Sequence, residues 1–576
     1  MTEKMSVDLH HLEPILAKYA SQGRKQLLPT LFEAQHVYGY LPEPVVTAIG
    51  RGLHVPLAEI HGVIEFYSMF YRRPTAETIV RVCTSPMCAM AGGKEAVEAA
   101  CKHLGVNLNE PSADGSCMVE EVQCLGLCDH APAALVGDSP VACIDPRDAA
   151  AWIKNPQEAS LGTIGGGPRW LSGRCGEIDP GDIKSFETNG GFSGLKKAIK
   201  SLKPEDVVAE IKASGLVGRG GAAFPTGLKW EYTAATDSES RYVVCNGDES
   251  EPGTFKDRVL MEGDPFAIIE GMAINGYAIG ATRGYLYVRG EYPRARRILQ
   301  RAIEQARQAG FLGENILGSK VDFDIELRSG AGAYICGEET ALFESIEGKR
   351  GYPRLKPPFP TTHGLFYKPT TINNVETLCT AAWIIANGAA EYRSRGTEES
   401  PGTKLFCLSG DIANPGVYEA AFGTPLGEII EIAGGVKGEL QAVLIGGAAG
   451  AFATPDQLDV PMSFEGLKAA GLALGSGVVM AINQSRDLRE IILALAHFFA
   501  HESCGKCFPC QLGTQRQLEI VTRIAEGIAD ESDVNALQDV IYTMTNASLC
   551  GLGMTAGAAI QSAMELWPHI FLNGNR

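Results

Sequence analysis

Hydrophobic residues at helical spacing dominate the first part of the chain. Leu9, Leu12, Ile15 and Leu16 recur on one helical face, and residues 27–32 continue the pattern, which predicts a helical bundle over residues 1–75. From Thr78 short β-rich runs take over: TIVRVC, MVEEVQC, AALV and VACI, with a helical stretch at 94–104 between the first two. This strand–helix–strand–strand order predicts a compact thioredoxin-like α/β domain over residues 76–150.

Glycine and proline are frequent in residues 151–189, which predicts a linker. Helical and strand patterns then alternate over residues 190–400, with helices at 205–216, 264–281 and 292–309 and strands around 243–244, 284–290 and 321–330. This alternation predicts a second α/β domain. A β-hairpin, a helix and a further strand fill residues 401–478, where we see no titratable cluster and expect a structural or docking role. Residues 479–576 are predicted to be largely helical.

Bulk composition restricts the class of protein. The chain has 576 residues and a formal net charge of −18, which argues against a nucleic-acid partner. No run of about 18 apolar residues is present, so no membrane span is expected. The opening MTEKMSVDLHHLEP lacks the apolar segment of a signal peptide. Sixteen cysteines then favour metal ligation in a reducing compartment over disulfides, so a cytoplasmic location is expected.

Four cysteines lie at the ends of the strands predicted in the thioredoxin-like domain, as Cys83-x4-Cys88 and Cys124-x3-Cys128. Thiolates at converging strand ends can hold an iron–sulfur cluster. Zinc is the competing metal, although its cysteine pairs are usually closer than the first pair here. A redox dithiol would require C-x-x-C, which this domain lacks. We interpret the remaining three as small buried hydrophobic residues: Cys101, Cys117 and Cys143.

A second cysteine pattern lies near the C-terminus. ESCGKCFPC places Cys504, Cys507 and Cys510 two residues apart, and Cys550 is the only cysteine downstream of them. Three close cysteines and one remote one are frequent around a [4Fe-4S] cluster. Zinc is again the alternative. This is the strongest local signal in the chain.

The stretch GRGGAAFPTGLKW at 218–230 is the candidate ligand loop. Glycines at 218, 220 and 221 allow close approach of the backbone to a ligand, while Arg219 and Lys229 offer charge to a phosphate. The loop follows a predicted helix, so an ordinary dinucleotide-binding Rossmann motif, which needs a strand there, does not fit. The polar loop CNGDESEPGTFKDR at 245–258 adds acidic groups after a predicted strand.

Together these motifs resemble a known family. GRGGAAFPTGLKW, CNGDESEPGTFKDR, GAGAYICGEET, INNVET and ESCGKCFPC with Cys550 make residues 190–576 similar to the NADH-binding flavoprotein subunit of respiratory complex I. Residues 1–150 resemble its thioredoxin-like [2Fe-2S] companion subunit. The chain thus resembles a fusion of the two, as in diaphorase subunits of NAD-reducing hydrogenases and NAD-dependent formate dehydrogenases. The resemblance implies a Rossmann-like domain at 190–400 that binds FMN and NADH, a β-grasp-like domain at 401–478 and a helical bundle with [4Fe-4S] at 479–576.

The resemblance also implies roles for individual residues. Those expected around FMN are Gly218, Arg219, Gly220, Lys229, Asn246, Asp248, Glu249, Tyr334, Gly337, Glu338, Asn373, Asn374 and Thr377. Those expected to face the nicotinamide nucleotide are Phe224, Glu251, Glu339, Lys356 and Phe359. Glu249 and Glu251 are the candidate catalytic residues. Aromatic rings can stack on adenine, and carboxylates near the ribose hydroxyls repel a 2′-phosphate, so we expect NAD rather than NADP.

The expected activity is that of an NADH:acceptor oxidoreductase. By resemblance, hydride passes between NAD(H) and FMN, and electrons pass singly through the clusters to or from partners. Those partners are a further iron–sulfur subunit and a catalytic subunit that acts on hydrogen, formate or a quinone. The chain departs from the family at Ala223, Gly247 and Gln511, none of which removes a ligand. The alternatives are a non-catalytic electron-relay or assembly subunit and a zinc-stabilised binding module.

Overall fold

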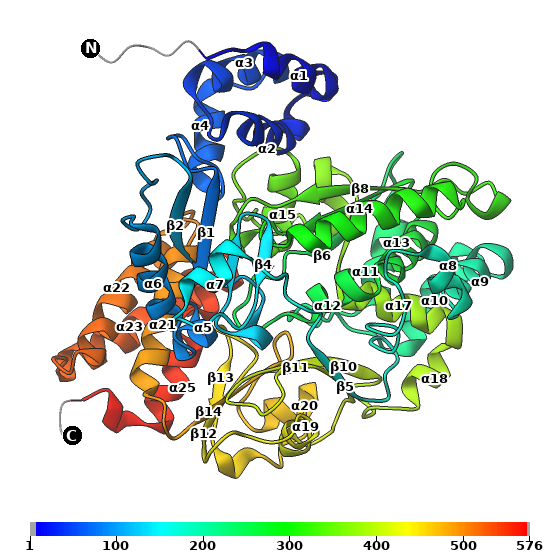
Figure 1. Ribbon diagram of the computed structural model, residues 1–576. Coiled ribbons are helices and arrows are strands. Elements are labelled where there is room, and N and C mark those ends of the chain that lie inside the picture. Colours follow the sequence, from blue (N-terminus) through cyan, green and yellow to red (C-terminus); the bar gives the residue numbers. More distant parts are fainter. Residues whose placement is uncertain (1–6, 573–576) are drawn as a thin grey trace.

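A computed structural model describes residues 7–572. Residues 1–6 and 573–576, at the ends of the first and last predicted domains, lie outside the described part. Figure 1 shows the N-terminal helices at the top, above the thioredoxin-like domain, which lies against the C-terminal helices on the left. The large α/β domain occupies the right side, and a third unit built on a six-stranded sheet lies below it.

The first two units follow the sequence pattern closely. The N-terminal helices are α1 (Glu13–Tyr19), α2 (Leu27–Tyr38), α3 (Glu43–Leu53) and α4 (Leu57–Phe66). The thioredoxin-like domain has a four-stranded sheet in the order β2-β1-β3-β4, formed by β1 (Thr78–Cys83), β2 (Cys117–Val122), β3 (Ala134–Val136) and β4 (Ser139–Val141). Its helices are α5 (Pro86–Met90) and α6 (Gly93–Leu104). The cysteine loops therefore leave the ends of β1 and β2.

The large α/β domain is built on a parallel sheet in the order β8-β7-β6-β9. Its strands are β6 (Tyr242–Gly247), β7 (Arg283–Val288), β8 (Asp324–Ser329) and β9 (Thr370–Asn374). Its helices are α9 (Ser193–Ser201), α10 (Pro204–Ser214), α11 (Thr226–Ala235), α12 (Lys256–Gly263), α13 (Pro265–Ile279), α14 (Pro293–Gln308), α15 (Glu339–Ile346), α16 (Pro360–His363), α17 (Val375–Asn387) and α18 (Ala389–Arg393). Helix α13 is apolar on nearly every side and is buried almost throughout, as a helix without a polar face must be.

The third unit contains a six-stranded sheet in the order β13-β12-β14-β10-β11-β5. Its strands are β10 (Thr403–Gly410), β11 (Gly416–Ala421), β12 (Leu440–Ile445), β13 (Ala451–Ala453), β14 (Val478–Asn483) and β5 (Thr163–Gly167). Its helices are α19 (Leu426–Ile432) and α20 (Phe464–Ala469). Strand β14 crosses the predicted boundary at residue 478, so this unit extends to residue 483.

The predicted linker at 151–189 is a larger departure from the sequence analysis. It contains α7 (Ala149–Lys154), α8 (Ile183–Thr188) and the strand β5, which pairs in parallel with β11. Its glycines serve close packing: a Cβ at Gly166 would lie 2.0 Å from the carbonyl oxygen of Glu419, and one at Gly165 would lie 2.7 Å from the Tyr418 ring. Composition alone does not separate such an edge strand from a flexible linker.

The C-terminal unit is helical, as predicted. Its helices are α21 (Leu488–Glu502), α22 (Phe508–Ala525), α23 (Glu531–Ala547), α24 (Gly551–Thr555) and α25 (Ala558–Leu566). Asp487 and Asp530 cap α21 and α23 by accepting hydrogen bonds from backbone amides of the first helical turns. Within residues 7–572 no helix is both long and apolar enough to cross a bilayer.

A buried ion pair fastens the thioredoxin-like domain to the large α/β domain. Both carboxylate oxygens of Asp129 accept hydrogen bonds from Arg258 Nη2 at 2.9 Å, and Arg258 Nε donates to the Gly126 carbonyl at 3.0 Å. We expect Arg258→Met to destabilise the chain by about 3–5 kcal/mol, because the Asp129 carboxylate then stays buried without its charged partner. Urea denaturation followed by tryptophan fluorescence measures this loss.

The matched control is Arg297→Met. Arg297 pairs with Glu158 at 2.6 Å, but both side chains are more than two-fifths exposed, so we expect a loss of at most about 1 kcal/mol. Equal losses in the two variants would contradict a fastening role for the buried pair.

Candidate functional site

The carboxyl ends of β6 and β9 form the centre of the site. From β6 the chain crosses to β7 and then to β8 on one side, whereas β9 joins β6 on the other side. This reversal is a topological switch point, where open α/β sheets bind ligands. Asn246 and Asn374 are paired in register at this edge. The sheet therefore brings together two segments predicted as ligand contacts that are far apart in sequence.

The glycine-rich loop closes over this edge from α10. Gly218 N donates to the Phe224 carbonyl at 2.9 Å, and Arg219 N donates to Thr377 Oγ1 at 2.8 Å. A Cβ at Gly220 would lie 3.2 Å from the Asn374 Cβ, so the loop passes tightly over that residue. The predicted loop, Asn374 and Thr377 thus form one cradle.

The Arg219 side chain does not face this cradle. Its guanidinium is buried, donates from Nη2 to the Tyr392 hydroxyl, and lies 4.6 Å from the Phe422 ring centroid. The prediction that Arg219 offers charge to a phosphate is therefore wrong for its side chain in this structure. The reason is packing, since the aromatic rings of Tyr392 and Phe422 take up the guanidinium.

Lys229 remains the cation at the cradle. Its Nζ donates to the Ile372 carbonyl at 2.8 Å, and burial lowers its pKa. The Phe224 ring centroid lies 5.9 Å from Nζ. Lys356 Nζ is shared between Glu338 Oε1 at 2.9 Å and Glu339 Oε1 at 2.6 Å. Phe224 and Phe359 are 46% and 57% exposed, so both rings are free to stack on a ligand.

The carboxylates of the acidic loop after β6 have different hydrogen-bond partners. Asn246 Nδ2 donates to the Gly337 carbonyl at 2.9 Å, and Asn246 Oδ1 accepts from Asp248 N at 3.1 Å. Glu249 is buried and accepts hydrogen bonds from Asp257 N at 2.8 Å and Arg258 N at 2.9 Å, so it anchors the start of α12. In this structure Glu249 therefore has a structural task, although the sequence analysis names it as a catalytic candidate.

Glu251 occupies a junction between units. It accepts a hydrogen bond from the Tyr334 hydroxyl, and its Oε1 accepts one from Ala449 N of the third unit at 2.8 Å. The backbone amide of Tyr334 in turn donates to Glu502 Oε2 at the end of α21 at 3.0 Å. Tyr334 thus connects the ligand edge with the helix that precedes Cys504.

Asp248 supplies a pH-dependent test. Its Oδ2 is buried without a hydrogen-bond partner, and burial raises its pKa to about 8. Because this folded-state pKa is above the unfolded value, its contribution to stability is present at low pH and is lost as the pH rises towards about 8. In the FMN-free chain the free energy of unfolding should therefore fall as the pH rises. We expect Asp248→Asn to make this fall less steep by up to about 1.4 kcal/mol per pH unit.

Melting temperatures between pH 6 and pH 8 measure this decline. The control is Asp114→Asn, because hydrogen bonds from Ser112 and Ser116 lower the pKa of Asp114 to about 2 and its carboxyl does not titrate in that range. An unchanged pH slope in the Asp248 variant would show that this carboxyl is not the titrating group.

The four thiols of the thioredoxin-like domain converge as two pairs. Cys124 Sγ and Cys128 Sγ are 3.5 Å apart, and this hydrogen bond lowers the pKa of Cys124 to about 7. Hydrogen bonding with Cys83, followed by burial, raises the pKa of Cys88 well above its usual value. Backbone amides of Gly126 and Gly253 each donate to a sulfur at 3.3 Å. Two close pairs with backbone donors suit a cluster in which four thiolates are divided between two irons.

The four C-terminal thiols line one cavity together with Ile335, Pro353, Leu549 and Leu552. Cys507 and Cys550 lie immediately before α22 and α24. Burial raises the pKa of Cys510 to about 12 and of Cys550 to about 11. Within residues 7–572 no three His, Cys, Asp or Glu side chains are placed around a single metal-ion position. Convergence of four thiols on one cavity suits a multi-iron cluster.

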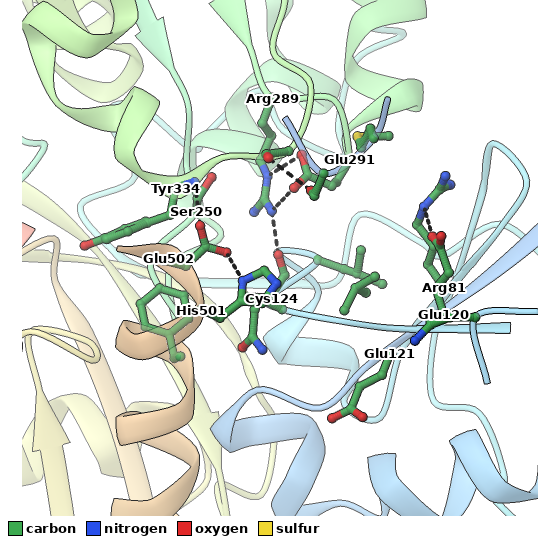
Figure 2. Close-up of a pocket in the computed structure, with 18 residues that line it drawn as sticks. Arg81, Glu120, Glu121, Cys124, Ser250, Arg289, Glu291, Tyr334, His501 and Glu502 are labelled. Carbon is green, nitrogen blue, oxygen red and sulfur yellow. Dashed lines mark hydrogen bonds and ion pairs between the residues drawn. The ribbon is translucent and has the colours of Figure 1, made fainter. Parts of the chain in front are cut away.

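A polar cavity lies where four units meet between these sites. Figure 2 shows Arg289 and Glu291 reaching down from the large α/β domain and His501 and Glu502 approaching from α21, around Cys124 of the thioredoxin-like domain. Arg289 Nη2 donates to the Cys124 carbonyl at 2.5 Å, and Tyr334 also lines the cavity. The Arg289 side chain therefore links the first cluster site to the large α/β domain, which carries the ligand edge.

The predicted residues fall into four groups. At the cradle lie Gly218, Gly220, Lys229, Asn246, Asp248, Gly337, Asn374 and Thr377. Around the exposed rings lie Phe224, Glu338, Glu339, Lys356 and Phe359, and at the junction lie Glu251 and Tyr334. Arg219, Glu249 and Asn373 use their side chains in internal contacts; Asn373 Oδ1 accepts from Trp230 Nε1 at 3.0 Å. Of the remaining cysteines, Cys143 is exposed and Cys101 and Cys117 are half-buried, so the prediction that these three are buried is wrong.

Sequence reasoning missed the buried charges behind the cradle. Lys256, Asp257, Glu376 and Lys404 lie within hydrogen-bonding distance of one another or of Asn374. The motifs quoted above contain three of these residues: Lys256, Asp257 and Glu376. Their place in the motifs could have marked them as candidates. Lys404 lies on β10 and has no local pattern that distinguishes it.

Comparisons with known proteins agree with this arrangement. Family models match at residues 12–157 (thioredoxin-like [2Fe-2S] ferredoxin), 211–383 (Nuo51 FMN-binding domain), 405–447 (SLBB domain) and 490–574 (NADH-ubiquinone oxidoreductase-F iron–sulfur binding region). The F subunit of the NADH-quinone oxidoreductase of Aquifex aeolicus is 46% identical over 388 residues, which cover 67% of this chain and 89% of that protein. The chain belongs to the family of NADH-quinone oxidoreductase F subunits.

A second relative matches almost the whole chain. The alpha subunit of the NAD-reducing hydrogenase HoxS of Cupriavidus necator is 36% identical over 573 residues, covering 97% of this chain and 93% of that protein. A crystal structure of an air-oxidised NAD+-reducing [NiFe]-hydrogenase matches with a TM-score of 0.84 and 34% identity, over 96% of this chain and 94% of that one. The predicted fused architecture and fold class are confirmed.

The F-subunit membership and the matched domains also confirm the predicted activity and cofactors. The protein is an NADH:acceptor oxidoreductase module with FMN, one [2Fe-2S] and one [4Fe-4S] cluster. The residues fit these groups: the cradle contains the unpartnered Asp248 Oδ2 and the close approach at Gly220, and each set of four thiols converges.

Proposed function

We propose that this chain exchanges hydride with NAD(H) at the β6–β9 edge and passes electrons out through the C-terminal cysteine site. The observation that carries the proposal is the segment at 334–335. Tyr334 is hydrogen-bonded to Glu251 at the ligand edge, and the neighbouring Ile335 lines the cavity of Cys504, Cys507, Cys510 and Cys550. Two adjacent residues thus border both sites, which suits electron transfer between them.

FMN, when bound, accepts a hydride and releases electrons one at a time, which is the chemistry that the protein's side chains have to support. In this proposal Gly218, Gly220, Asn246, Asp248, Gly337, Asn374 and Thr377 orient it, and Lys229 neutralises its phosphate. Phe224 and Phe359 stack on the nicotinamide nucleotide, and Lys356 with Glu338 and Glu339 borders it. Tyr334 and Ala449 fix the Glu251 carboxylate, which selects NAD over NADP by repelling a 2′-phosphate.

The partners belong to the same proposal. The relatives are subunits named for a quinone oxidoreductase and an NAD-reducing hydrogenase, so this chain is proposed to serve a hetero-oligomer. A further iron–sulfur subunit exchanges electrons with the [4Fe-4S] site, and a catalytic subunit acts on hydrogen, formate or a quinone. Sixteen cysteines suit a reducing compartment, which supports a cytoplasmic location.

An anaerobic titration of the purified full chain with NADH tests the function. We expect about one FMN and about six iron atoms per chain, with bleaching of both the flavin and the iron–sulfur absorption bands. Zinc in place of iron would favour a zinc-stabilised binding module. Full iron and FMN occupancy without bleaching would instead favour a non-catalytic electron-relay subunit.

A further inference from the structure

The first turn of α17 is fastened on three sides. Asn374 caps the helix by accepting a hydrogen bond from Glu376 N at 3.0 Å. Thr377 holds the glycine-rich loop through Arg219 N at 2.8 Å. Glu376 points the other way, to the third unit, where its Oε1 accepts from Leu405 N at 3.0 Å. A displacement at Glu376 would therefore move both residues that border the cradle.

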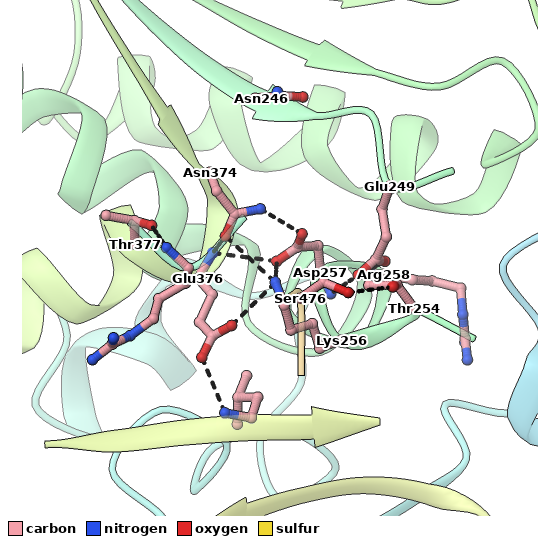
Figure 3. Close-up of polar contacts among 12 residues, drawn as sticks. Asn246, Glu249, Thr254, Lys256, Asp257, Arg258, Asn374, Glu376, Thr377 and Ser476 are labelled. Atoms are coloured by element: carbon pink, nitrogen blue, oxygen red, sulfur yellow. Dashed lines mark hydrogen bonds and ion pairs between the residues drawn. The ribbon is translucent and has the colours of Figure 1, made fainter. Parts of the chain in front are cut away.

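Buried charges continue from Glu376 in both directions, as Figure 3 shows. Lys404 Nζ of β10 lies 2.6 Å from Glu376 Oε2, and Lys256 Nζ lies 3.0 Å from the same oxygen. Lys256 also pairs with Asp257 Oδ1 at 2.8 Å. Asp257 Oδ2 then accepts from Asn374 Nδ2 at 2.6 Å. This series of contacts therefore leads from Lys404 to the side-chain amide of Asn374, which borders the cradle.

The network is charge-balanced and buried. It contains two lysines and two carboxylates, and each of these side chains is at most 3% exposed. Buried ion pairs add little net stability compared with well-packed apolar side chains, so stability alone does not account for three such pairs together. Their geometry does suggest a reason: every link restricts the position of Asn374 or of the first turn of α17.

We propose that Lys404 is a positioning residue for the flavin site, acting from the third unit through Glu376 on Asn374 and Thr377. This inference rests on the proposed placement of FMN at the cradle. It assigns to β10 a task beyond the structural or docking role expected from sequence. Lys404 itself does not touch the cradle: its Nζ bonds to Glu376 and to the Leu405 carbonyl.

The first test is Lys404→Met in the full chain from which FMN has been removed, with FMN affinity measured by fluorescence quenching on titration. We expect the dissociation constant to rise about 10- to 100-fold, because small misplacement of orienting groups carries effects of that size. At saturating FMN, kcat should fall more than the KM for NADH changes, because Phe224 is the one predicted nucleotide residue on the loop that Thr377 holds. Lys404→Arg keeps the charge and should restore most of the affinity.

The matched control is Glu419→Gln. Glu419 lies on β11 of the same unit and is fully buried. It accepts hydrogen bonds from the backbone amides of residues 170–172 and from Thr403 Oγ1, but none of its hydrogen bonds goes to Asn374, Glu376 or Thr377. Its variant should lose stability but keep wild-type FMN affinity. Equal affinity in the Lys404→Met and Glu419→Gln variants would overturn the positioning role.

Should Lys404→Met fail to fold, the charge-balanced double variant Lys404→Met with Glu376→Gln decides the matter. It leaves Lys256 paired with Asp257, so we expect a folded chain with weakened FMN binding. A folded double variant with wild-type FMN affinity would overturn the inference. Failure of the wild-type chain itself to bind FMN or to be reduced by NADH would instead overturn the proposed function, which keeps the two failures distinguishable.

Discussion

Replacing Cys510 by serine is expected to reduce electron export strongly while the NADH-dependent bleaching of the flavin band persists. Cys510 is the most buried of the four thiols that line the C-terminal cavity. Three thiols and a weakly bound hydroxyl are a poor ligand set for a [4Fe-4S] cluster. We expect iron to fall from about six to about two atoms per chain and transfer to the partner complex to fall on the order of 100-fold.

Electron paramagnetic resonance after addition of NADH provides the direct readout. The signal of a reduced four-iron cluster should disappear, whereas that of the two-iron cluster should remain. Cys143→Ser is the control, because Cys143 is exposed and lies outside both thiol sets. Undiminished electron export by a Cys510 variant that contains only two irons would rule out an exit through this site.

Replacing Lys229 by methionine should weaken FMN binding about 10- to 100-fold. The Lys229 ammonium is buried, and the only hydrogen bond described for it is to the Ile372 carbonyl. Its positive charge is therefore available to a phosphate, and a charge-assisted hydrogen bond of this kind contributes about 1.5–3 kcal/mol. FMN titration of the deflavinated chain by fluorescence quenching measures the change.

Lys212→Met is the matched control for this variant. Lys212 lies on α10 and forms a half-exposed ion pair with Glu231 at 2.7 Å, so its loss should leave FMN affinity unchanged. Wild-type affinity in the Lys229 variant would place the phosphate elsewhere on the β6–β9 edge.

Local patterns allowed the thiol sites and most of the elements to be predicted. Cysteine spacing is informative because three cysteines of the C-terminal set lie within seven residues, and both pairs of the first set follow strand ends. The alternating strands and helices of the large α/β domain were likewise legible, since each element has its own periodicity. These features depend on neighbours in sequence.

Features set by distant neighbours could not be predicted. The direction of the Arg219 side chain depends on Tyr392 and Phe422, and the importance of Lys404 depends on Glu376, 28 residues before it. Glu249 is a catalytic candidate by its motif, yet backbone amides at the start of α12 donate hydrogen bonds to its carboxylate. In each case the sequence does not show which partner the side chain contacts.

The strand β5 has a consequence for how the chain folds during synthesis. Residues 163–167 pair with β11, and Trp170 N bonds to Glu419, 249 residues further along. All four strands of the thioredoxin-like sheet lie before residue 142. They therefore leave the ribosome long before β11, the partner of β5, is synthesised. At a synthesis rate of about 5–20 residues per second, β11 emerges on the order of 10–50 s after β5. During this interval all four strands of the thioredoxin-like domain have been synthesised, whereas residues 163–167 have no strand with which to pair.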